Sequence, residues 1–237
     1  RIQGTESGGR IGISDLRNYV QMIQALAINA SLNPSPAAAP VPSKPVQAAL
    51  PDFSKFGPIK KVSVTSLRQK IGDKMVQSWT TVPHVTQFDE ADITKMMELR
   101  KKYVEKYKSK GAGLTVTVFA IKAAVSALKK FPAFNATFDS EKGEMIYKEY
   151  YNIGVAVDTE NGLIVPVIRD ADKKSMMKIA LELGEVAERA RKRTLTMDDL
   201  QGGTFTISNL GGLGVGPFTP IVNTPEVAIL AMSKGSM

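Results

Sequence analysis

The chain has 237 residues and a mass of 25.6 kDa, with 43% hydrophobic and 23% charged residues, which suffices for one large hydrophobic core. It contains no cysteine, which excludes disulfides, thiolate metal ligands and a cysteine nucleophile. No apolar run reaches the roughly eighteen residues of a membrane span, and the first residues lack the apolar centre of a secretory signal peptide.

Residues 1–30 begin with a glycine-rich turn at positions 4–11 and continue as a helical pattern from Ser14 to about Ala27. Ser14 is a candidate N-cap. The apolar stripe of this helix consists of Leu16, Tyr19, Val20 and Ile23. A single helix of this length is not stable alone in water, so it is either a remnant or docks on another surface.

Residues 31–58 hold seven of the thirteen prolines, a run of three alanines and few charges. Such a segment cannot build a packed core and favours extended, semi-rigid conformations. It predicts a Pro/Ala-rich linker between two folded parts.

Residues 59–237 predict a folded body in which helices and strands are interspersed, which indicates a mixed α/β (α+β) class without internal repeats. The expected helices are 64–79, 94–108, 116–130 and 175–192. The expected strands are 84–90, 152–158, 163–169, 204–208 and 227–232. The two strands within 152–169 flank an Asn-Gly turn and predict a hairpin, in which Pro166 indicates an edge position or a bulge.

The formal net charge of +8 is densest at positions 95–110, where seven Lys and Arg stand against two Glu. This segment reads as a helix with Met96, Leu99, Tyr103 and Tyr107 on one face. We interpret its charges as a solvated helix face, with a surface for polyanions as the alternative. No zinc finger, helix-turn-helix or aromatic RNA-binding signature is present, so nucleic acid is not an expected partner.

The segment GGTFTISNLGGLG at 202–214 joins a β-branched strand to a loop rich in glycine. The strand ends at Ser208, whose hydroxyl comes to lie where backbone can approach a ligand closely. A strand-end serine that bonds nearby backbone is the simpler interpretation, and a catalytic hydroxyl is the alternative.

Five segments carry a family resemblance when they are taken together. They are VPHVTQFD at 82–89, YNIGVAVD at 151–158, GLIVPV at 162–167, the serine-glycine segment at 202–214, and TPIVNTPEVAIL at 219–230. In this order they resemble the acyltransferase components of the 2-oxo acid dehydrogenase complexes, most nearly the dihydrolipoamide acetyltransferases of the pyruvate dehydrogenase type. Several long matches in one order are more specific than any single match.

The resemblance implies a fold for each part of the chain. Residues 59–237 resemble a catalytic domain with a chloramphenicol acetyltransferase-like core, lacking its C-terminal part. Residues 1–30, through Gly-Thr-x-x-x-Gly-Arg-Ile and Asp15, resemble the second half of a helical peripheral-subunit-binding domain. We therefore expect a chain truncated at both ends, with Arg10 as a candidate docking contact.

The resemblance also implies partners and a compartment. Family members form homotrimers that build cubic or dodecahedral cores, and they dock the pyruvate decarboxylase component and dihydrolipoamide dehydrogenase. Lipoate would be covalently bound to a lipoyl domain absent from these residues, coenzyme A would be a substrate, and neither a metal nor a membrane is expected. The compartment would be the bacterial cytoplasm or the mitochondrial matrix.

The implied reaction passes an acetyl group from S-acetyldihydrolipoamide to the thiol of coenzyme A, which needs a base and an oxyanion donor. In the family the serine aligned with Ser208 is the donor, and the histidine of His-x-x-x-Asp-Gly is the base. That motif is absent from these 237 residues, and we expect it beyond Met237. For His84, the only histidine, we expect a structural or channel position. The glycine-rich loop makes Asn209, Gly211 and Gly212 candidate substrate-binding residues.

Other functions stay open at this point. Without the histidine motif we expect these 237 residues alone to be inactive, and a non-catalytic scaffold or docking subunit of the complex is one alternative. An acyltransferase for a different 2-oxo acid would differ only in its acyl group. A chloramphenicol-type resistance enzyme would share the fold without needing the docking remnant or the proline linker.

Overall fold

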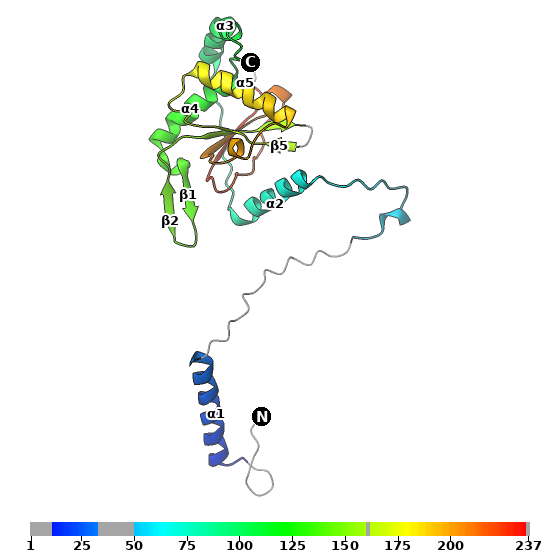
Figure 1. Ribbon diagram of the computed structural model, residues 1–237, viewed down its shortest axis with the longest axis vertical. Coiled ribbons are helices and arrows are strands. Elements are labelled where there is room, and N and C mark those ends of the chain that lie inside the picture. The colour runs from blue at the N-terminus through cyan, green and yellow to red at the C-terminus, as the bar shows by residue number, and fades with distance from the viewer. Residues whose placement is uncertain (1–10, 33–49, 160–161, 236–237) are drawn as a thin grey trace. The chain divides into compact units, whose positions relative to one another are not determined.

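The computed structural model describes residues 11–32, 50–159 and 162–235, and the chain divides into two units at residues 61 and 62 (Figure 1). None of the helices in these ranges combines the length and the apolarity that crossing a membrane requires. Arg10 and most of the predicted linker lie outside the described residues.

The first unit contains helix α1 (Ile13–Leu32) and a short 3-10 helix, η1 (Phe53–Lys55). Ser14 is not the N-cap of α1, because it already lies inside the helix. Instead, the carboxylate of Asp15 in the first turn accepts a hydrogen bond of 2.8 Å from the Gly12 amide, as the acidic residue of a capping box does. The predicted helix is therefore present, but it spans residues 13–32 and not 14–27.

The second unit is built on a mixed four-stranded sheet of order β6-β3-β7-β8. Its strands are β3 (Ile153–Val155), β6 (Val167–Ile168), β7 (Phe205–Asn209) and β8 (Ile229–Met232). Strand β7 runs parallel to β3 and to β8, whereas β6 runs antiparallel to β3. Strand β7 therefore has a hydrogen-bonded neighbour on each side, β3 and β8, and these pairings fix the position of its end.

Two small hairpins accompany the sheet. They are β1 (Ala136–Asp139) with β2 (Glu144–Tyr147), and β4 (Val157–Thr159) with β5 (Gly162–Ile164). The predicted hairpin over 152–169 is thus confirmed, since β3–β6 and β4–β5 are its two halves. Pro166 stands between β5 and the edge strand β6, where its carbonyl accepts from the Val155 amide at 2.9 Å. This is the interruption that proline imposes on a strand.

The helices of this unit are α2 (Ser66–Thr81), α3 (Thr94–Lys108), α4 (Val116–Lys130) and α5 (Met176–Lys192), with short 3-10 helices η2 (Pro132–Asn135), η3 (Asp198–Leu200) and η4 (Gly211–Leu213). Helix α4 ends just before Pro132, which cannot continue a helix. Helix α5 is capped by Ser175, whose hydroxyl accepts from the Lys178 amide at 3.2 Å. The end of α4 and the beginning of α5 agree with the helices predicted at 116–130 and 175–192.

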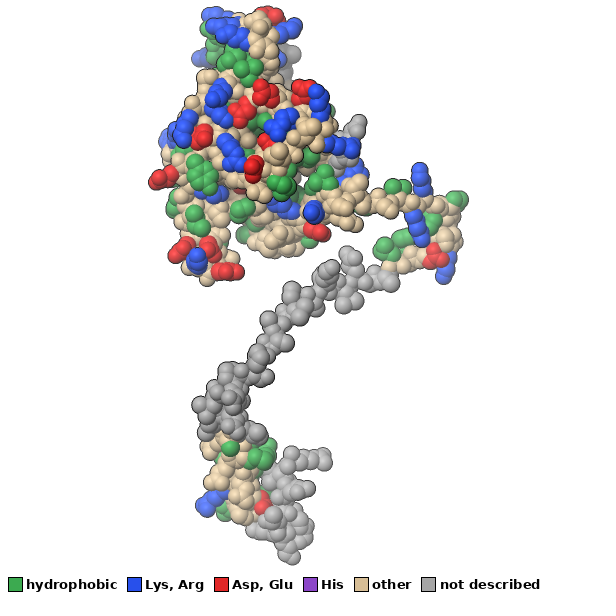
Figure 2. All heavy atoms as spheres, in the orientation of Figure 1, with side chains coloured by type: hydrophobic (Ala, Val, Ile, Leu, Met, Phe, Trp, Pro, Cys, Tyr) green, Lys and Arg blue, Asp and Glu red, His purple; other side chains and the backbone are tan. Residues whose placement is uncertain are grey.

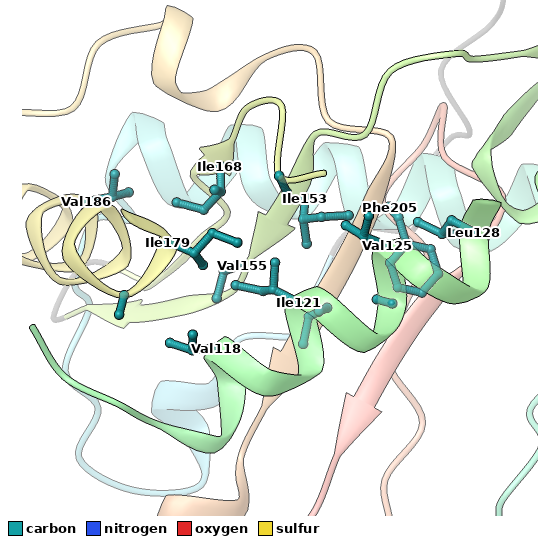
Figure 3. Close-up of a cluster of buried hydrophobic side chains, with 14 of the residues drawn as sticks. Val118, Ile121, Val125, Leu128, Ile153, Val155, Ile168, Ile179, Val186 and Phe205 are labelled. Carbon is teal, nitrogen blue, oxygen red and sulfur yellow. The ribbon is translucent and has the colours of Figure 1, made fainter. Parts of the chain in front are cut away.

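The hydrophobic core lies between α4, α5 and one face of the sheet (Figure 3). Val118 and Ile121 of α4, Ile179 of α5 and Ile153 and Ile207 of the sheet are 0% exposed. Full burial of each such side chain contributes on the order of 1.5–3 kcal/mol to folding. The core fixes α4 against β7, and this contact sets up the site described below.

The prediction of a strand at 84–90 is wrong, because the structure forms no strand there. Residues 83–93 belong to no helix or strand, and Val85 is 94% exposed. The alternating pattern is real, but a strand forms only where a second strand supplies hydrogen bonds, and none of the described strands does so here.

Candidate functional site

Strand β7 and the residue before it present a row of three hydroxyls from buried residues on one face. Thr204 directly precedes the strand and alternates with Thr206 and Ser208, so the three side chains point to the same side. Phe205 and Ile207 point to the other side and belong to the core. A row of buried hydroxyls requires polar partners, because an unsatisfied buried hydroxyl is unfavourable.

Two of these hydroxyls are satisfied by the protein itself. Thr204 Oγ1 donates to the Asn152 carbonyl at 3.1 Å and accepts from the Asn152 amide at 3.2 Å. Thr206 Oγ1 donates to Glu226 Oε2 at 2.6 Å. Ser208 is only 6% exposed, yet its hydroxyl has no hydrogen-bond partner in the part of the chain that the structure describes. The Ser208 hydroxyl is therefore a donor on a largely buried residue and remains available to a ligand.

The backbone that follows Ser208 is tightly held. Asn209 Oδ1 accepts from the Gly211 amide at 2.9 Å, and Leu210 N donates to the Met232 carbonyl at 3.0 Å. A Cβ on Gly211 would lie 2.6 Å from the Ser233 carbonyl oxygen, so this position needs glycine. At Gly212 a Cβ would meet open space. The structure thus explains Gly211 by contact with its own chain, and the predicted substrate contacts of Asn209, Gly211 and Gly212 stay predictions.

Glu226 is a buried carboxylate that sequence reasoning missed. It is 4% exposed and accepts from Thr206 and, at 3.3 Å, from Asn223 Nδ2. Burial raises the pKa of this carboxyl above 4.5, although the hydrogen bonds from Thr206 and Asn223 oppose that shift. Burial in turn lowers the pKa of Lys148, and the charge of Glu226 partly offsets this. The alternation Thr-x-Thr-x-Ser was the one sequence signal that a polar partner faces this strand.

His84 has both ring nitrogens engaged by backbone. The Val222 amide donates to Nε2 at 3.0 Å, so the ring proton lies on Nδ1, which is 2.8 Å from the Val82 carbonyl oxygen. The ring also lies 5.2 Å from that of Trp79, between centroids. A histidine bound in this way joins two segments of chain and has no free nitrogen to accept a proton. This geometry supports the structural role expected for His84.

The basic segment forms α3, and Figure 2 shows its Lys and Arg side chains at the surface. Its apolar face, with Leu99, Tyr103 and Tyr107, lines a cavity of about 450 Å³ against α4 and the start of α5. Arg100 is half-buried and donates to the Leu114 carbonyl at 2.9 Å, whereas the six lysines of this segment are exposed. The charges are thus mainly a solvated helix face.

Among the described residues, no group of three or more His, Asp and Glu is placed to hold a metal ion.

Comparisons with known proteins give a consistent result. The catalytic domain of the 2-oxoacid dehydrogenases acyltransferase family matches residues 56–236. The chain is 42% identical over 238 residues to the dihydrolipoyllysine-residue acetyltransferase component of the pyruvate dehydrogenase complex of Cupriavidus necator, and 41% identical over 236 residues to that of Staphylococcus aureus strain Mu50. These alignments include 99% and 98% of this chain, but only 42% and 54% of the two relatives. The chain therefore spans about half the length of the curated relatives it matches.

Solved structures agree with this match. The dihydrolipoamide acetyltransferase of Azotobacter vinelandii superimposes with a TM-score of 0.79 at 46% identity, covering 81% of this chain and 79% of that one. That structure was studied for the role of a serine, a histidine and an asparagine in its catalytic mechanism. A truncated catalytic core of the 2-oxoacid dehydrogenase complex of Thermoplasma acidophilum gives a TM-score of 0.70 at 41% identity, covering 74% and 80%. The predicted α/β class and core are thereby confirmed.

Proposed function

The chain belongs to the 2-oxoacid dehydrogenase acyltransferase family, and from that premise we propose that it transfers an acetyl group from S-acetyldihydrolipoamide to coenzyme A in the core of a pyruvate dehydrogenase complex. The observation that carries this proposal is the Ser208 hydroxyl. It is the one hydroxyl of the β7 row without a partner among the described residues, and it stands at the strand end.

The chemistry requires a donor at this place. When the thiol of coenzyme A attacks the acetyl thioester, negative charge develops on the former carbonyl oxygen. Ser208 would donate a hydrogen bond to that oxygen, in a buried position where such a bond is stronger than in water. Because its hydroxyl is not bound elsewhere in the described chain, no existing bond has to break first.

The base that accepts the thiol proton would come from outside these 237 residues. They contain one histidine, and both nitrogens of His84 are engaged. We therefore expect the 237-residue polypeptide alone to transfer no acetyl groups, and Ser208 to act together with a base that these residues do not include. Coenzyme A and the acetylated dihydrolipoyl group enter this scheme as substrates.

Assembly is a further part of the proposal, because the surface of the second unit carries large exposed apolar side chains. Trp79, Val85 and Phe88 are 58%, 94% and 57% exposed. Exposed apolar side chains of this size favour contact with other protein surfaces. They support a homotrimer built into a larger core, such as the cubic core of the pyruvate dehydrogenase complex with which this chain shares 46% identity. Docking of the decarboxylase and of dihydrolipoamide dehydrogenase near Arg10 completes the proposal.

An assay of coenzyme A acylation tests this function. The protein as its source organism makes it and the 237-residue polypeptide would each receive coenzyme A with the acetyl, succinyl or isobutyryl thioester of dihydrolipoamide. We expect the source protein to prefer the acetyl donor and the polypeptide to be inactive. Preference for another donor would assign a different 2-oxo acid complex, and turnover by the polypeptide that requires His84 would refute the external base.

A non-catalytic scaffold is the second candidate, favoured by the absence of His-x-x-x-Asp-Gly from these residues. It predicts that the source protein binds its complex but acylates coenzyme A with none of the three donors. The same assay therefore separates the two functions.

A further inference from the structure

Asn209 lies next to Ser208 but on the opposite face of β7. Strand alternation places its side chain on the side of Phe205 and Ile207, which face the core. There its amide nitrogen donates to Thr117 Oγ1 at 3.0 Å. Thr117 is buried in the first turn of α4. This hydrogen bond joins the end of β7 directly to the beginning of α4.

The other polar atom of Asn209 is also engaged within the protein. Its Oδ1 accepts from the Gly211 amide at 2.9 Å and so closes the turn that follows the strand. With the amide nitrogen bound to Thr117, both polar ends of the side chain are occupied. The side chain of Asn209 therefore has structural partners on both sides, which link β7 to α4 and to the turn that follows the strand.

We propose that the Asn209–Thr117 hydrogen bond positions Ser208 for acyl transfer, so that both residues are positioning residues of the site. This inference rests on the proposed function. Helix α4 is a rigid reference because Val118 and Ile121, just after Thr117, are 0% exposed in the core. The bond sets where β7 ends relative to that helix, and thereby where the Ser208 hydroxyl lies. An oxyanion donor is effective only within a narrow range of distances from the developing charge.

The substitution Thr117→Val tests this directly. Valine has nearly the shape of threonine but offers no oxygen, so it leaves the Asn209 amide without its acceptor. Because a small misplacement at a reacting centre reduces rate strongly, we expect kcat for coenzyme A acetylation to fall on the order of tenfold. KM for coenzyme A should stay unchanged. Thr117→Ser keeps the hydroxyl and is the matched control, for which we expect nearly wild-type kcat.

A double-mutant cycle with Ser208→Ala distinguishes positioning from general damage. The four proteins would be produced as the source organism makes them and compared at equal folded concentration. If Thr117 acts through Ser208, Thr117→Val lowers kcat in the wild-type background and has little further effect in the Ser208→Ala background. Equal losses in both backgrounds, or no loss in either, would overturn the inference.

The cycle also separates the catalytic role of Ser208 from the positioning role of Thr117. If Ser208→Ala itself leaves kcat unchanged, the proposed role of Ser208 fails and the positioning role fails with it. If Ser208→Ala lowers kcat but Thr117→Val does not couple to it, only the positioning role is wrong. Asn209→Ala removes the same bond from the other side, together with the bond from the Gly211 amide to Oδ1, and should also couple to Ser208, which provides a second variant if Thr117→Val folds poorly.

Discussion

The buried carboxylate of Glu226 should make the stability of the second unit depend on pH. The perturbation is Glu226→Gln, which keeps the shape of the side chain and removes its charge. Glu226 is 4% exposed, and no Lys or Arg among the described residues is within salt-bridge distance of it. Its partners are the hydroxyl of Thr206 and the amide of Asn223. A glutamine can accept from Asn223 and donate to Thr206, so it mimics the protonated acid.

The sign and size of the effect follow from the raised pKa. Burial raises the pKa of Glu226 above 4.5, so the folded state holds the proton more tightly than the unfolded state does. The stabilisation from the protonated acid is complete below pH 4.5 and is lost as the pH rises through the folded pKa. Between pH 4.5, the unfolded pKa, and the higher folded pKa, the free energy of unfolding falls by about 1.4 kcal/mol per pH unit. In Glu226→Gln this contribution to the pH dependence disappears.

Denaturant unfolding from pH 4 to pH 8 measures this difference. We expect the two proteins to have similar free energies of unfolding at the acidic end, with the wild type falling below Glu226→Gln as the pH rises. Thr206→Val is the control for the hydrogen bond alone, and loss of that buried partner should destabilise the protein by about 1–3 kcal/mol. Parallel curves for wild type and Glu226→Gln would instead show that the carboxylate ionises in the folded state without penalty.

Three further predictions concern the scaffold. Ile121→Ala, at a fully buried core position, should lower the free energy of unfolding by about 2–5 kcal/mol in denaturant titrations. Gly211→Ala should lower the melting temperature, because the new Cβ would lie 2.6 Å from the Ser233 carbonyl oxygen and backbone cannot easily withdraw. The hydrogen bond from Arg189, more than any other contact, lowers the pKa of Asp199 from 3.8 to about 2, so its stabilisation is present above pH 3.8 and is lost as the pH falls towards 2. Asp199→Asn should therefore reduce stability at pH 5 more than at pH 2, as measured by thermal unfolding at both pH values.

Local sequence signals predicted the elements that depend on local interactions. Helix α4 follows from an apolar period that ends before Pro132, and α5 follows from its own apolar period and the basic residues at its C-terminal end. Strand β7 was visible in its β-branched and aromatic residues, and Ser208 in the abrupt change to glycine. In each case the residues that determine the element lie within or beside it.

The remaining features depend on residues far apart in the sequence. The pattern at 84–90 has strand character, but whether a strand forms depends on a partner that the pattern does not name. The β1–β2 hairpin was not predicted, because its turn has no Asn-Gly signal and reverses instead at Gly143 with a φ of +67°. Thr117, which binds the Asn209 amide, lies 92 residues away from it, and Thr206, which binds Glu226, lies 20 residues away, so no local sequence pattern reveals these two contacts.

The rate of acetyl transfer by Ser208→Ala shows whether the Ser208 hydroxyl is the oxyanion donor. The substitution should leave the unfolding free energy almost unchanged, because no described residue bonds to that hydroxyl. It should lower kcat about a hundredfold or more, the usual effect of removing an oxyanion donor. Thr206→Val, which removes a hydroxyl from the same face of β7, should instead lower stability and retain kcat in the folded protein. Wild-type kcat in Ser208→Ala would contradict the account.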